Sequence, residues 1–317
     1  MFPRSAPHRI LLYHPDQAQA YARLVKAPKR AIRLNVCSTR EEAAARIGDA
    51  EMLYAWHFPP DLLAQASRLS WIQAMGAGVE RFLVPELPPK VIVTRATGMF
   101  GAWMAEYTLG WCAWVTQRME ETREAQRERR WHSPAPEPLH GRTLAIVGLG
   151  NIGGEIARAG AALGMRVIGV NRGGRNRPGV ARVYRSSALT QVLGQADFAV
   201  VVLPLTEGTR GLIGEAELRA MKSSAWLLNI GRGAVIDEAA LIRALSRKWI
   251  AGVILDVFDT EPLPPEHALW AMSNVVITPH IAGPSIPEEI APVFNDNLRR
   301  YLSGKTLRYV VDRSQGY

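Results

Sequence analysis

Short apolar runs alternate with amphipathic stretches along almost the whole chain. In the first hundred residues, four runs rich in β-branched, aliphatic and aromatic residues are typical of strands: 10–13, 32–36, 52–56 and 91–94. Between them lie three stretches with helical spacing: 17–26, 40–47 and 60–67. Strands that alternate with helices predict a parallel sheet.

A second alternation of the same kind extends from residue 143 to about residue 283. A long helix is expected before it at 103–119, and the proline-rich segment 131–141 is expected to be a connecting loop. A last helix, 287–302, should return to the first sheet. We therefore expect an α/β protein of two doubly wound parallel-sheet domains with a cleft between them, built from residues 1–100 with 285–317 and from residues 101–284.

Composition places the chain among ordinary globular proteins, since 48% of its 317 residues are hydrophobic and 21% are charged. Two cysteines, Cys37 and Cys112, argue against a disulfide framework and for a reducing compartment. No apolar run is long enough to span a membrane, and the start lacks the apolar core of a secretory signal. We expect a cytoplasmic protein with no membrane partner and no metal site.

The net charge of +9 first suggests a nucleic-acid partner, but the distribution of charge argues against one. The densest basic stretch, Arg118 to Arg130, has four glutamates interleaved with its arginines. This pattern is typical of a solvated, ion-paired helix rather than of a track for phosphates. We expect no nucleic-acid partner.

Four aromatic residues share one face of the helix expected at 103–119: Trp103, Tyr107, Trp111 and Trp114. Such a face is typical of a buried interface between domains or subunits. Because most oligomers are two-fold dimers, we expect a homodimer with this helix and its charged continuation as the contact.

A glycine-rich turn, 148–153, directly follows the apolar run 144–147. A helix expected at 155–163 and a strand at 166–170 complete the context that dinucleotide binding requires. The three glycines permit a tight turn, close approach to a pyrophosphate and close packing of helix on strand, while the helix N-terminus offers amide donors. The sequence therefore predicts phosphate contacts from this turn: Gly148, Gly150, Asn151, Ile152 and Gly153.

The end of the next strand indicates which cofactor binds. NAD-binding proteins usually carry Asp or Glu there, which accepts hydrogen bonds from the ribose 2′-hydroxyl. This chain has Asn171 and Arg172, with Arg175 and Arg177 close behind. Guanidinium groups can pair with a 2′-phosphate, so NADPH is predicted in preference to NADH, although these arginines could also form a simple solvated loop.

Three polar residues follow probable strands in the second half of the chain: Arg232, Glu261 and His280. Open parallel sheets place ligand-binding groups at such strand ends. Arg can grip a carboxylate through its planar fork, His can donate a proton near neutral pH, and a neighbouring Glu can orient that His. Together these groups are the parts needed to reduce a 2-oxo acid.

With these motifs assembled, nearly the whole chain resembles the D-isomer-specific 2-hydroxyacid dehydrogenases. The resemblance rests on the glycine-rich turn and on segments 203–206, 229–237, 255–258, 261–263 and 278–280. Within that family the chain is most similar to the glyoxylate/hydroxypyruvate reductase A branch, through Trp56-His57, Thr97-Gly98-Met99, the arginine-bearing loop and the C-terminal ending.

The resemblance implies that Arg232 binds and polarises the substrate, that His280 donates the proton and that Glu261 orients His280. It also implies that backbone amides of Gly76, Ala77 and Gly78 hold the substrate carboxylate. Asp256 would contact the nicotinamide carboxamide. Further cofactor contacts are implied for Leu203, Pro204, Thr209, Asn229, Ile230, Gly231 and His280 itself.

Some alternatives stay open. Trp56 could be a wall of the substrate pocket or ordinary packing at a strand end, and His57 is expected to be structural or at the rim. After His280 many relatives continue with two alanines, whereas this chain has Ile281 and Ala282, so the wall beside the nicotinamide could differ in shape.

The function that the sequence favours is NADPH-dependent reduction of glyoxylate or hydroxypyruvate to the 2-hydroxy acid. The alternatives are a dehydrogenase for another 2-hydroxy acid, such as 3-phosphoglycerate, and a non-catalytic dinucleotide-sensing protein of the same fold.

Overall fold

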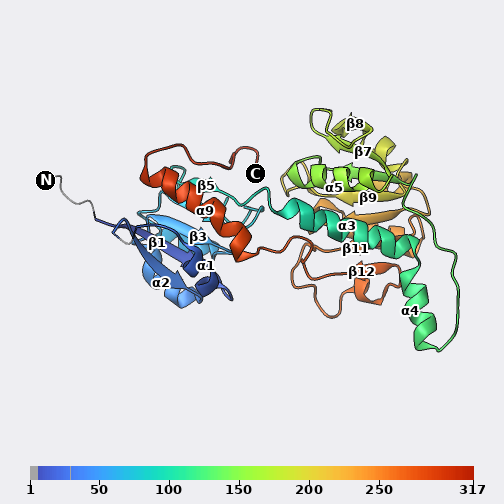
Figure 1. Ribbon diagram of the computed structural model, residues 1–317, viewed down its shortest axis with the longest axis horizontal. Helices are drawn as coiled ribbons and strands as arrows, with labels where there is room; N and C mark the ends of the chain where they lie inside the picture. Colours follow the sequence, from blue (N-terminus) through green and yellow to red (C-terminus); the bar gives the residue numbers. More distant parts are fainter. Residues whose placement is uncertain (1–5, 29) are drawn as a thin grey trace. The chain divides into compact units, whose positions relative to one another are not determined.

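The computed structural model describes residues 6–28 and 30–317, and the chain divides into two compact α/β units (Figure 1). Unit 1 comprises Met1–Met99 and Ser285–Tyr317, and unit 2 comprises Phe100–Pro284. Each unit contains one sheet in which all paired strands are parallel. The predicted fold class is confirmed.

Unit 1 contains a five-stranded sheet in the order β2-β1-β3-β4-β5. Its strands are β1 (His8–Tyr13), β2 (Ile32–Cys37), β3 (Met52–Ala55), β4 (Trp71–Ala74) and β5 (Ile92–Thr94). The order reverses between β1 and β3, and in open sheets ligands bind at the carboxyl ends of the strands at such a switch point.

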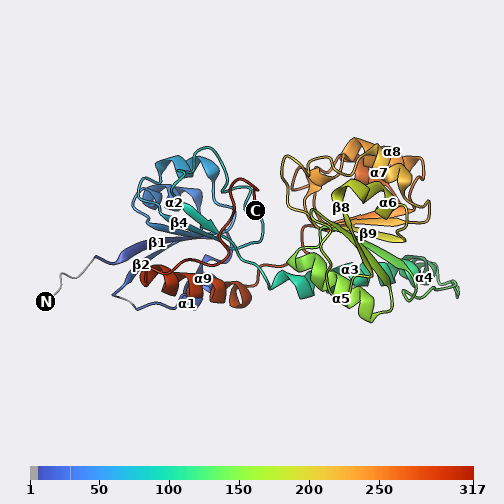
Figure 2. The same ribbon diagram turned by 90° about the horizontal axis from the view of Figure 1, so that it is seen from above.

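Helices cover both faces of this sheet: α1 (Ala18–Leu24), α2 (Arg40–Ile47), the 3₁₀ helix η1 (Pro60–Gln65) and α9 (Pro287–Leu302). Figure 2 shows α1 and α9 on one face and α2 on the other. Phe294 of α9 stacks on Tyr54 with ring centroids 4.0 Å apart, and Asn297 donates to Gln73 at 3.0 Å. The last helix therefore completes the core of unit 1.

Unit 2 contains a seven-stranded sheet in the order β12-β11-β10-β9-β6-β7-β8. Its strands are β6 (Thr143–Val147), β7 (Arg166–Asn171), β8 (Arg182–Arg185), β9 (Phe198–Val201), β10 (Trp226–Asn229), β11 (Gly252–Leu255) and β12 (Val275–Ile277). The central strands β6, β9 and β11 are buried along their whole length, which is why they read as continuous apolar runs.

The helices of unit 2 also lie on both faces of its sheet (Figure 2). One face carries α3 (Phe100–Thr116) and α5 (Asn151–Ala162), and the other carries α6 (Leu189–Leu193), α7 (Glu215–Ala220) and α8 (Glu238–Ser246). Further helical segments are α4 (Met119–Arg127), η2 (Ser186–Ala188), η3 (Gly233–Val235) and η4 (Ala268–Ala271).

Several element boundaries differ from those expected. The helix expected at 103–119 is α3, which ends at Thr116 because the chain turns through Arg118 with φ of +53° before α4 begins. The helix expected at 155–163 begins four residues earlier, at Asn151, so the glycine-rich sequence itself forms its first turn. Strand β4 was not expected, since its four residues include the polar Gln73.

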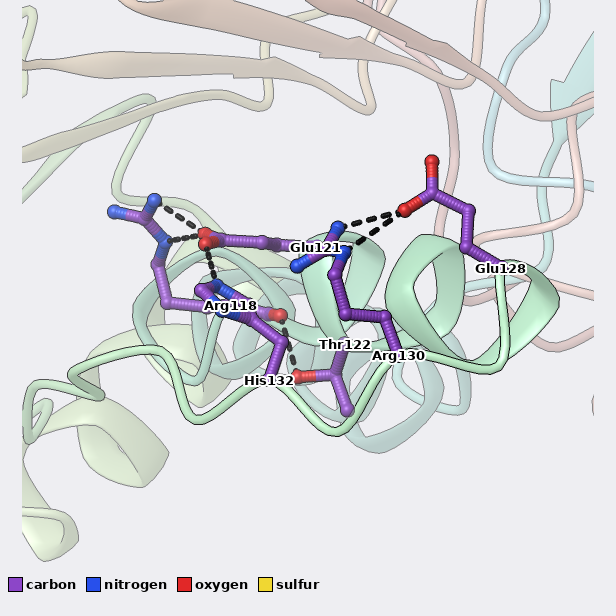
Figure 3. A network of polar contacts seen from close by, with 6 residues as sticks. All are labelled: Arg118, Glu121, Thr122, Glu128, Arg130 and His132. Atoms are coloured by element: carbon purple, nitrogen blue, oxygen red, sulfur yellow. Dashed lines mark hydrogen bonds and ion pairs between the residues drawn. The ribbon is translucent and has the colours of Figure 1, made fainter.

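The charged stretch that begins at Arg118 is an ion-paired helix and loop (Figure 3). Glu121 pairs with both Arg118 and His132, and Glu128 pairs with Arg130 at 2.7 Å. The hydroxyl of Thr122 donates to the carbonyl of Arg118 at 3.0 Å, which secures the first turn of α4. The predicted pairing of interleaved charges is confirmed. Among the described residues, no helix is both long and apolar enough to cross a bilayer.

Candidate functional site

The residues predicted for catalysis lie at the carboxyl ends of three adjacent strands of unit 2. Arg232 follows β10, Glu261 lies in the segment after β11 and His280 follows β12. These strands are neighbours in the order β12-β11-β10, and because they are parallel their carboxyl ends share one edge of the sheet. These residues are spread over about fifty positions in the sequence. The order of the strands brings the segments that carry them to the carboxyl edge of the sheet.

His280 is held against Glu261. The imidazole Nδ1 lies 2.8 Å from Oε2 of Glu261, while Oε1 accepts the backbone N–H of Phe258 at 3.0 Å. Burial would raise the pKa of Glu261, but these hydrogen bonds, together with electrostatic attraction to His280 and Arg232, outweigh it and hold the pKa below its ordinary value. The ionised carboxylate therefore orients the imidazole through Nδ1 and leaves Nε2 for other partners.

The buried carboxylate of Asp256 anchors the segment that carries His280. Its Oδ1 accepts the hydroxyl of Thr278 at 2.6 Å and the N–H of Ile281 at 2.9 Å, and its Oδ2 accepts the N–H of Ala282 at 2.9 Å. The backbone of His280 has φ of +56°, an uncommon conformation for a residue with a side chain, and its N–H donates to the carbonyl of Asp256 at 2.9 Å. This structural role of Asp256 was not expected, because the resemblance implies only a contact with the cofactor for this residue.

Arg232 projects from a tight turn that Asn229 closes. Asn229 Nδ2 donates to the carbonyl of Arg232 at 3.0 Å, and its Oδ1 accepts the N–H of Gly231 at 3.2 Å. A Cβ on Gly231 would lie 2.7 Å from the carbonyl oxygen of Leu203, and one on Gly233 would overlap the backbone of Phe258. The glycines therefore let the Arg232 turn pack against both the β9 loop and the segment that leads to Glu261. Ile230, inside this turn, is buried.

The glycine-rich turn has the shape that a pyrophosphate requires. Gly148 has φ of +111°, and a Cβ there would lie 2.5 Å from the carbonyl oxygen of Val202. A Cβ on Gly153 would overlap the carbonyl oxygen of Gly148, whereas a Cβ on Gly150 would point into open space. Gly150 is the N-cap of α5 and has no side chain with which to cap the helix, whose first turn begins with Asn151 and Ile152. The turn fits a dinucleotide phosphate at a helix N-terminus.

The loop after β7 is closed by the side chain of Asn171. Asn171 Nδ2 donates to the carbonyl of Arg175 at 2.8 Å, and its Oδ1 accepts the N–H of Arg175 at 3.0 Å. Arg172 and Arg175 are exposed. In the register of β7 and β8, Asn171 lies opposite Arg185, whose side chain also lies beside Gly174. Arg185 was not predicted, because the short strand β8 was not expected.

The loop after β9 is fixed by its own hydroxyl groups. Thr209 Oγ1 donates to the carbonyl of Pro204 at 2.7 Å and accepts the N–H of Thr206 at 2.8 Å. Leu203 lies against both Gly148 and Gly231. The predicted residues of this loop therefore border the glycine-rich turn on one side and the Arg232 turn on the other.

In unit 1, aromatic rings gather at the switch point of the sheet. Trp56 follows β3 and stacks on His57, with centroids 4.4 Å apart, and on His14, with centroids 6.3 Å apart. His14 follows β1; its Nδ1 accepts the N–H groups of Asp16 and Gln17, and burial lowers its pKa, so it is neutral with its proton on Nε2. No local pattern in the sequence marks His14.

The turn formed by Gly76, Ala77 and Gly78 begins two residues after β4 and lies under the Trp56 ring. A Cβ on Gly76 would lie 2.5 Å from Cζ3 of Trp56, so only glycine allows this contact. The carbonyls of Gly76 and Ala77 accept hydrogen bonds from the N–H of Ala96 at 3.1 Å and from Nη1 of Arg95 at 3.2 Å. Arg95 was not predicted, because its contact depends on β5 lying beside β4.

The described part of the chain has no group of three or more His, Cys, Asp or Glu side chains that could hold a metal ion.

Comparison with known proteins gives consistent results. Residues 110–282 match the family described as D-isomer specific 2-hydroxyacid dehydrogenase, NAD binding domain. A glyoxylate reductase of Aeropyrum pernix is 37% identical over 268 residues, which cover 80% of this chain and 79% of the relative. The glyoxylate/hydroxypyruvate reductase A of Photorhabdus laumondii is 30% identical and covers 97% of this chain and 99% of its own length. The crystal structure of an NADPH-dependent glyoxylate/hydroxypyruvate reductase from Sinorhizobium meliloti, in complex with NADP and sulfate, has a TM-score of 0.89 and 29% identity, and covers 99% of this chain and 100% of its own.

Proposed function

Since the chain belongs to the D-isomer specific 2-hydroxyacid dehydrogenase family of oxidoreductases, we propose that it reduces a small 2-oxo acid, glyoxylate or hydroxypyruvate, to the 2-hydroxy acid with NADPH. The observation that carries the proposal is the hydrogen-bonded pair of His280 and Glu261 at the edge of the sheet that also carries Arg232. The names of the relatives favour these two substrates.

Each of the three side chains has a definite task in this proposal. Arg232 binds the substrate carboxylate and stabilises the negative charge that develops on the 2-oxo oxygen. His280 holds a proton on Nε2 and donates it to that oxygen, and Glu261 keeps Nδ1 occupied so that the ring presents Nε2. When bound, the nicotinamide cofactor supplies the hydride to carbon 2.

The remaining predicted residues bind and orient. In unit 2 the cofactor phosphates are assigned to the glycine-rich turn from Gly148 to Gly153 and the nicotinamide side to Asp256. The β9 loop, with Leu203, Pro204 and Thr209, and the 229–231 turn are assigned to the rest of the cofactor. In unit 1 the Gly76–Gly78 turn is assigned to the substrate carboxylate, and Trp56 to a wall beside it.

The direct test follows NADPH oxidation at 340 nm with glyoxylate, hydroxypyruvate, pyruvate and phenylpyruvate. We expect turnover to be best with the first two and to fall ~10²–10⁴-fold in His280→Ala, the usual range for a general acid. His267→Ala is the matched control, because His267 forms a similar pair with Glu238 at 3.0 Å and is not assigned to the site. Unchanged turnover in His280→Ala, or an equal loss in both variants, contradicts the assignment.

The same experiment distinguishes two alternative functions. If the protein reduces none of the four acids but oxidises 3-phosphoglycerate, another 2-hydroxy acid is favoured as the substrate. Tight cofactor binding without turnover of any acid favours a dinucleotide-sensing protein, because that class can keep the same three side chains.

NADPH preference rests on the segment from Asn171 at the end of β7 to Arg185 in β8, whose fifteen residues include five arginines and no Asp or Glu. An Asp at position 171 cannot donate to the carbonyl of Arg175, and its charge repels a 2′-phosphate. We expect Asn171→Asp to lower the ratio of kcat/KM for NADPH over NADH by at least ~10-fold, about the effect of one charge-assisted contact.

Asn176→Asp is the control, since it adds the same charge to an exposed position of the same loop. A wild-type ratio below one contradicts NADPH preference. Equal effects of the two substitutions would assign the result to the general charge of the loop rather than to position 171.

A further inference from the structure

We propose that Arg95 is a positioning residue of the carboxylate site: it orients and polarises the Gly76–Gly78 turn through the Ala77–Gly78 peptide. The proposal rests on the proposed function, which assigns this turn to the substrate carboxylate. It adds a cation to the glycine turn of unit 1, whose predicted contacts with the carboxylate are backbone amides alone.

The geometry begins at the end of β5. Arg95 is the first residue after this strand, and its Nη1 donates to the carbonyl oxygen of Ala77 at 3.2 Å. The next residue, Ala96, donates its N–H to the carbonyl oxygen of Gly76 at 3.1 Å. Two consecutive carbonyls of the turn are thus directed toward the end of β5.

Peptide geometry then fixes the direction of the amides. In a planar trans peptide the N–H points opposite to the carbonyl of the same unit. The N–H groups of Ala77 and Gly78 therefore point away from β5, and neither donates to a backbone carbonyl in the part of the chain that the structure describes. Both residues are partly exposed, so an anion can reach these two donors.

Arg95 also makes the amide that it orients a stronger hydrogen-bond donor. A guanidinium on the carbonyl oxygen of Ala77 polarises the peptide and makes the N–H of Gly78 a better donor. The guanidinium is partly buried, where charge interactions are stronger than in water. Burial lowers the pKa of Arg95 while electrostatic interactions with Glu80 and Tyr317 oppose that shift, and an arginine stays charged throughout.

Unit 1 offers a matched control at the opposite end of the same strand. Arg313 Nη2 donates to the carbonyls of Pro88 at 3.1 Å and Val91 at 2.6 Å, and burial lowers its pKa as well. Arg313 therefore also donates to backbone carbonyls, as Arg95 does. Its contacts lie before β5 and not beside the glycine turn.

The experiment compares wild type with Arg95→Gln, Arg95→Lys and Arg313→Gln. Calorimetry measures the Kd of oxamate, an unreactive carboxylate analogue of a 2-oxo acid, for the NADPH-loaded protein, and steady-state kinetics give KM and kcat for glyoxylate. We expect Arg95→Gln to raise the Kd and KM ~10-fold or more with little change in kcat, because the carboxylate is bound alike before and during reaction. Arg95→Lys should recover part of the loss, and Arg313→Gln should lower Tm only.

Several outcomes overturn the proposal. They are oxamate binding by Arg95→Gln equal to that of wild type, an equal loss in Arg313→Gln, a fall in kcat with KM unchanged, and no oxamate binding by wild type. The proposed function fails separately if wild type reduces no 2-oxo acid while its oxamate binding still depends on Arg95.

Discussion

At the scale of single residues, Glu261 links the chemistry of the site to pH. Its carboxylate accepts from both His280 and Phe258, so Glu261→Gln removes the charge while keeping a group of the same shape. We expect kcat/KM for glyoxylate to fall roughly 10–100-fold, the range for loss of a charge-assisted hydrogen bond. Glu238→Gln, which alters the similar pair with His267, should leave kcat/KM unchanged.

The stability of the same variant should depend on pH in a defined direction. The pKa of Glu261 is lowered in the folded protein, so its contribution to folding is complete above the ordinary carboxyl pKa of about 4.3 and is lost as pH falls through the lower, folded value. The difference in Tm between wild type and Glu261→Gln should therefore be large at neutral pH and shrink below about pH 4. A difference that grows as pH falls would contradict the ionised state assigned to this side chain.

Residues could be predicted from the sequence where a local pattern marks them. Arg232 and His280 come three residues after strands that read as apolar runs, and the glycine-rich turn lies between a strand and a helix, so their positions at strand ends follow from the pattern. Arg95, Arg185 and His14 have no such mark. Their contacts depend on which strands are neighbours, and the sequence does not state the order of strands in a sheet.

At the scale of elements, α5 shows how closely a helix can approach a strand. Gly153 and Gly154 are adjacent in its first turns, but a Cβ on Gly153 would overlap the carbonyl of Gly148 whereas one on Gly154 would meet nothing within 4 Å. We expect Gly153→Ala to destabilise the protein by about 1–3 kcal/mol and to weaken NADPH binding, because the turn must shift. Gly154→Ala should raise stability by up to about 1 kcal/mol through its better helix propensity.

Thermal unfolding and cofactor titration by fluorescence measure both effects. The pair is a stringent comparison, since the two substitutions add the same methyl group one residue apart. Equal changes in Tm, or normal NADPH binding by Gly153→Ala, would show that the close contact is not required.

Elements were predicted well where their pattern is long and poorly where it is short. The helix at 287–302 was expected with its observed bounds, because sixteen residues carry a clear helical period and Pro287 marks the start. The four-residue strand β4 was not expected, although all four residues are buried. Its pairing with β3 and β5, rather than its own alternation, makes it a strand.

At the scale of the whole molecule, the predicted contact of a homodimer is partly used within unit 2. Tyr107 donates to or accepts from Thr278 at 2.6 Å, and the ring of Trp114 meets Trp226 edge to face at 6.1 Å. Trp103 at the start of α3 and Met119 at the start of α4 remain 41% and 43% exposed. The interface that we propose therefore centres on the starts of α3 and α4, at Trp103 and Met119, and does not use all four aromatic residues of α3.

Light scattering after size-exclusion chromatography tests the assembly. A chain of 35.0 kDa should elute with about twice that mass, and Trp103→Glu should shift it toward the monomer, because a buried, unpaired charge is costly at an interface. Trp270→Glu is the control, since Trp270 is 53% exposed on η4 and lies outside the proposed contact. A wild-type mass of one chain, or dissociation by both substitutions alike, would show that α3 does not form the interface, and the aromatic face would then need another partner.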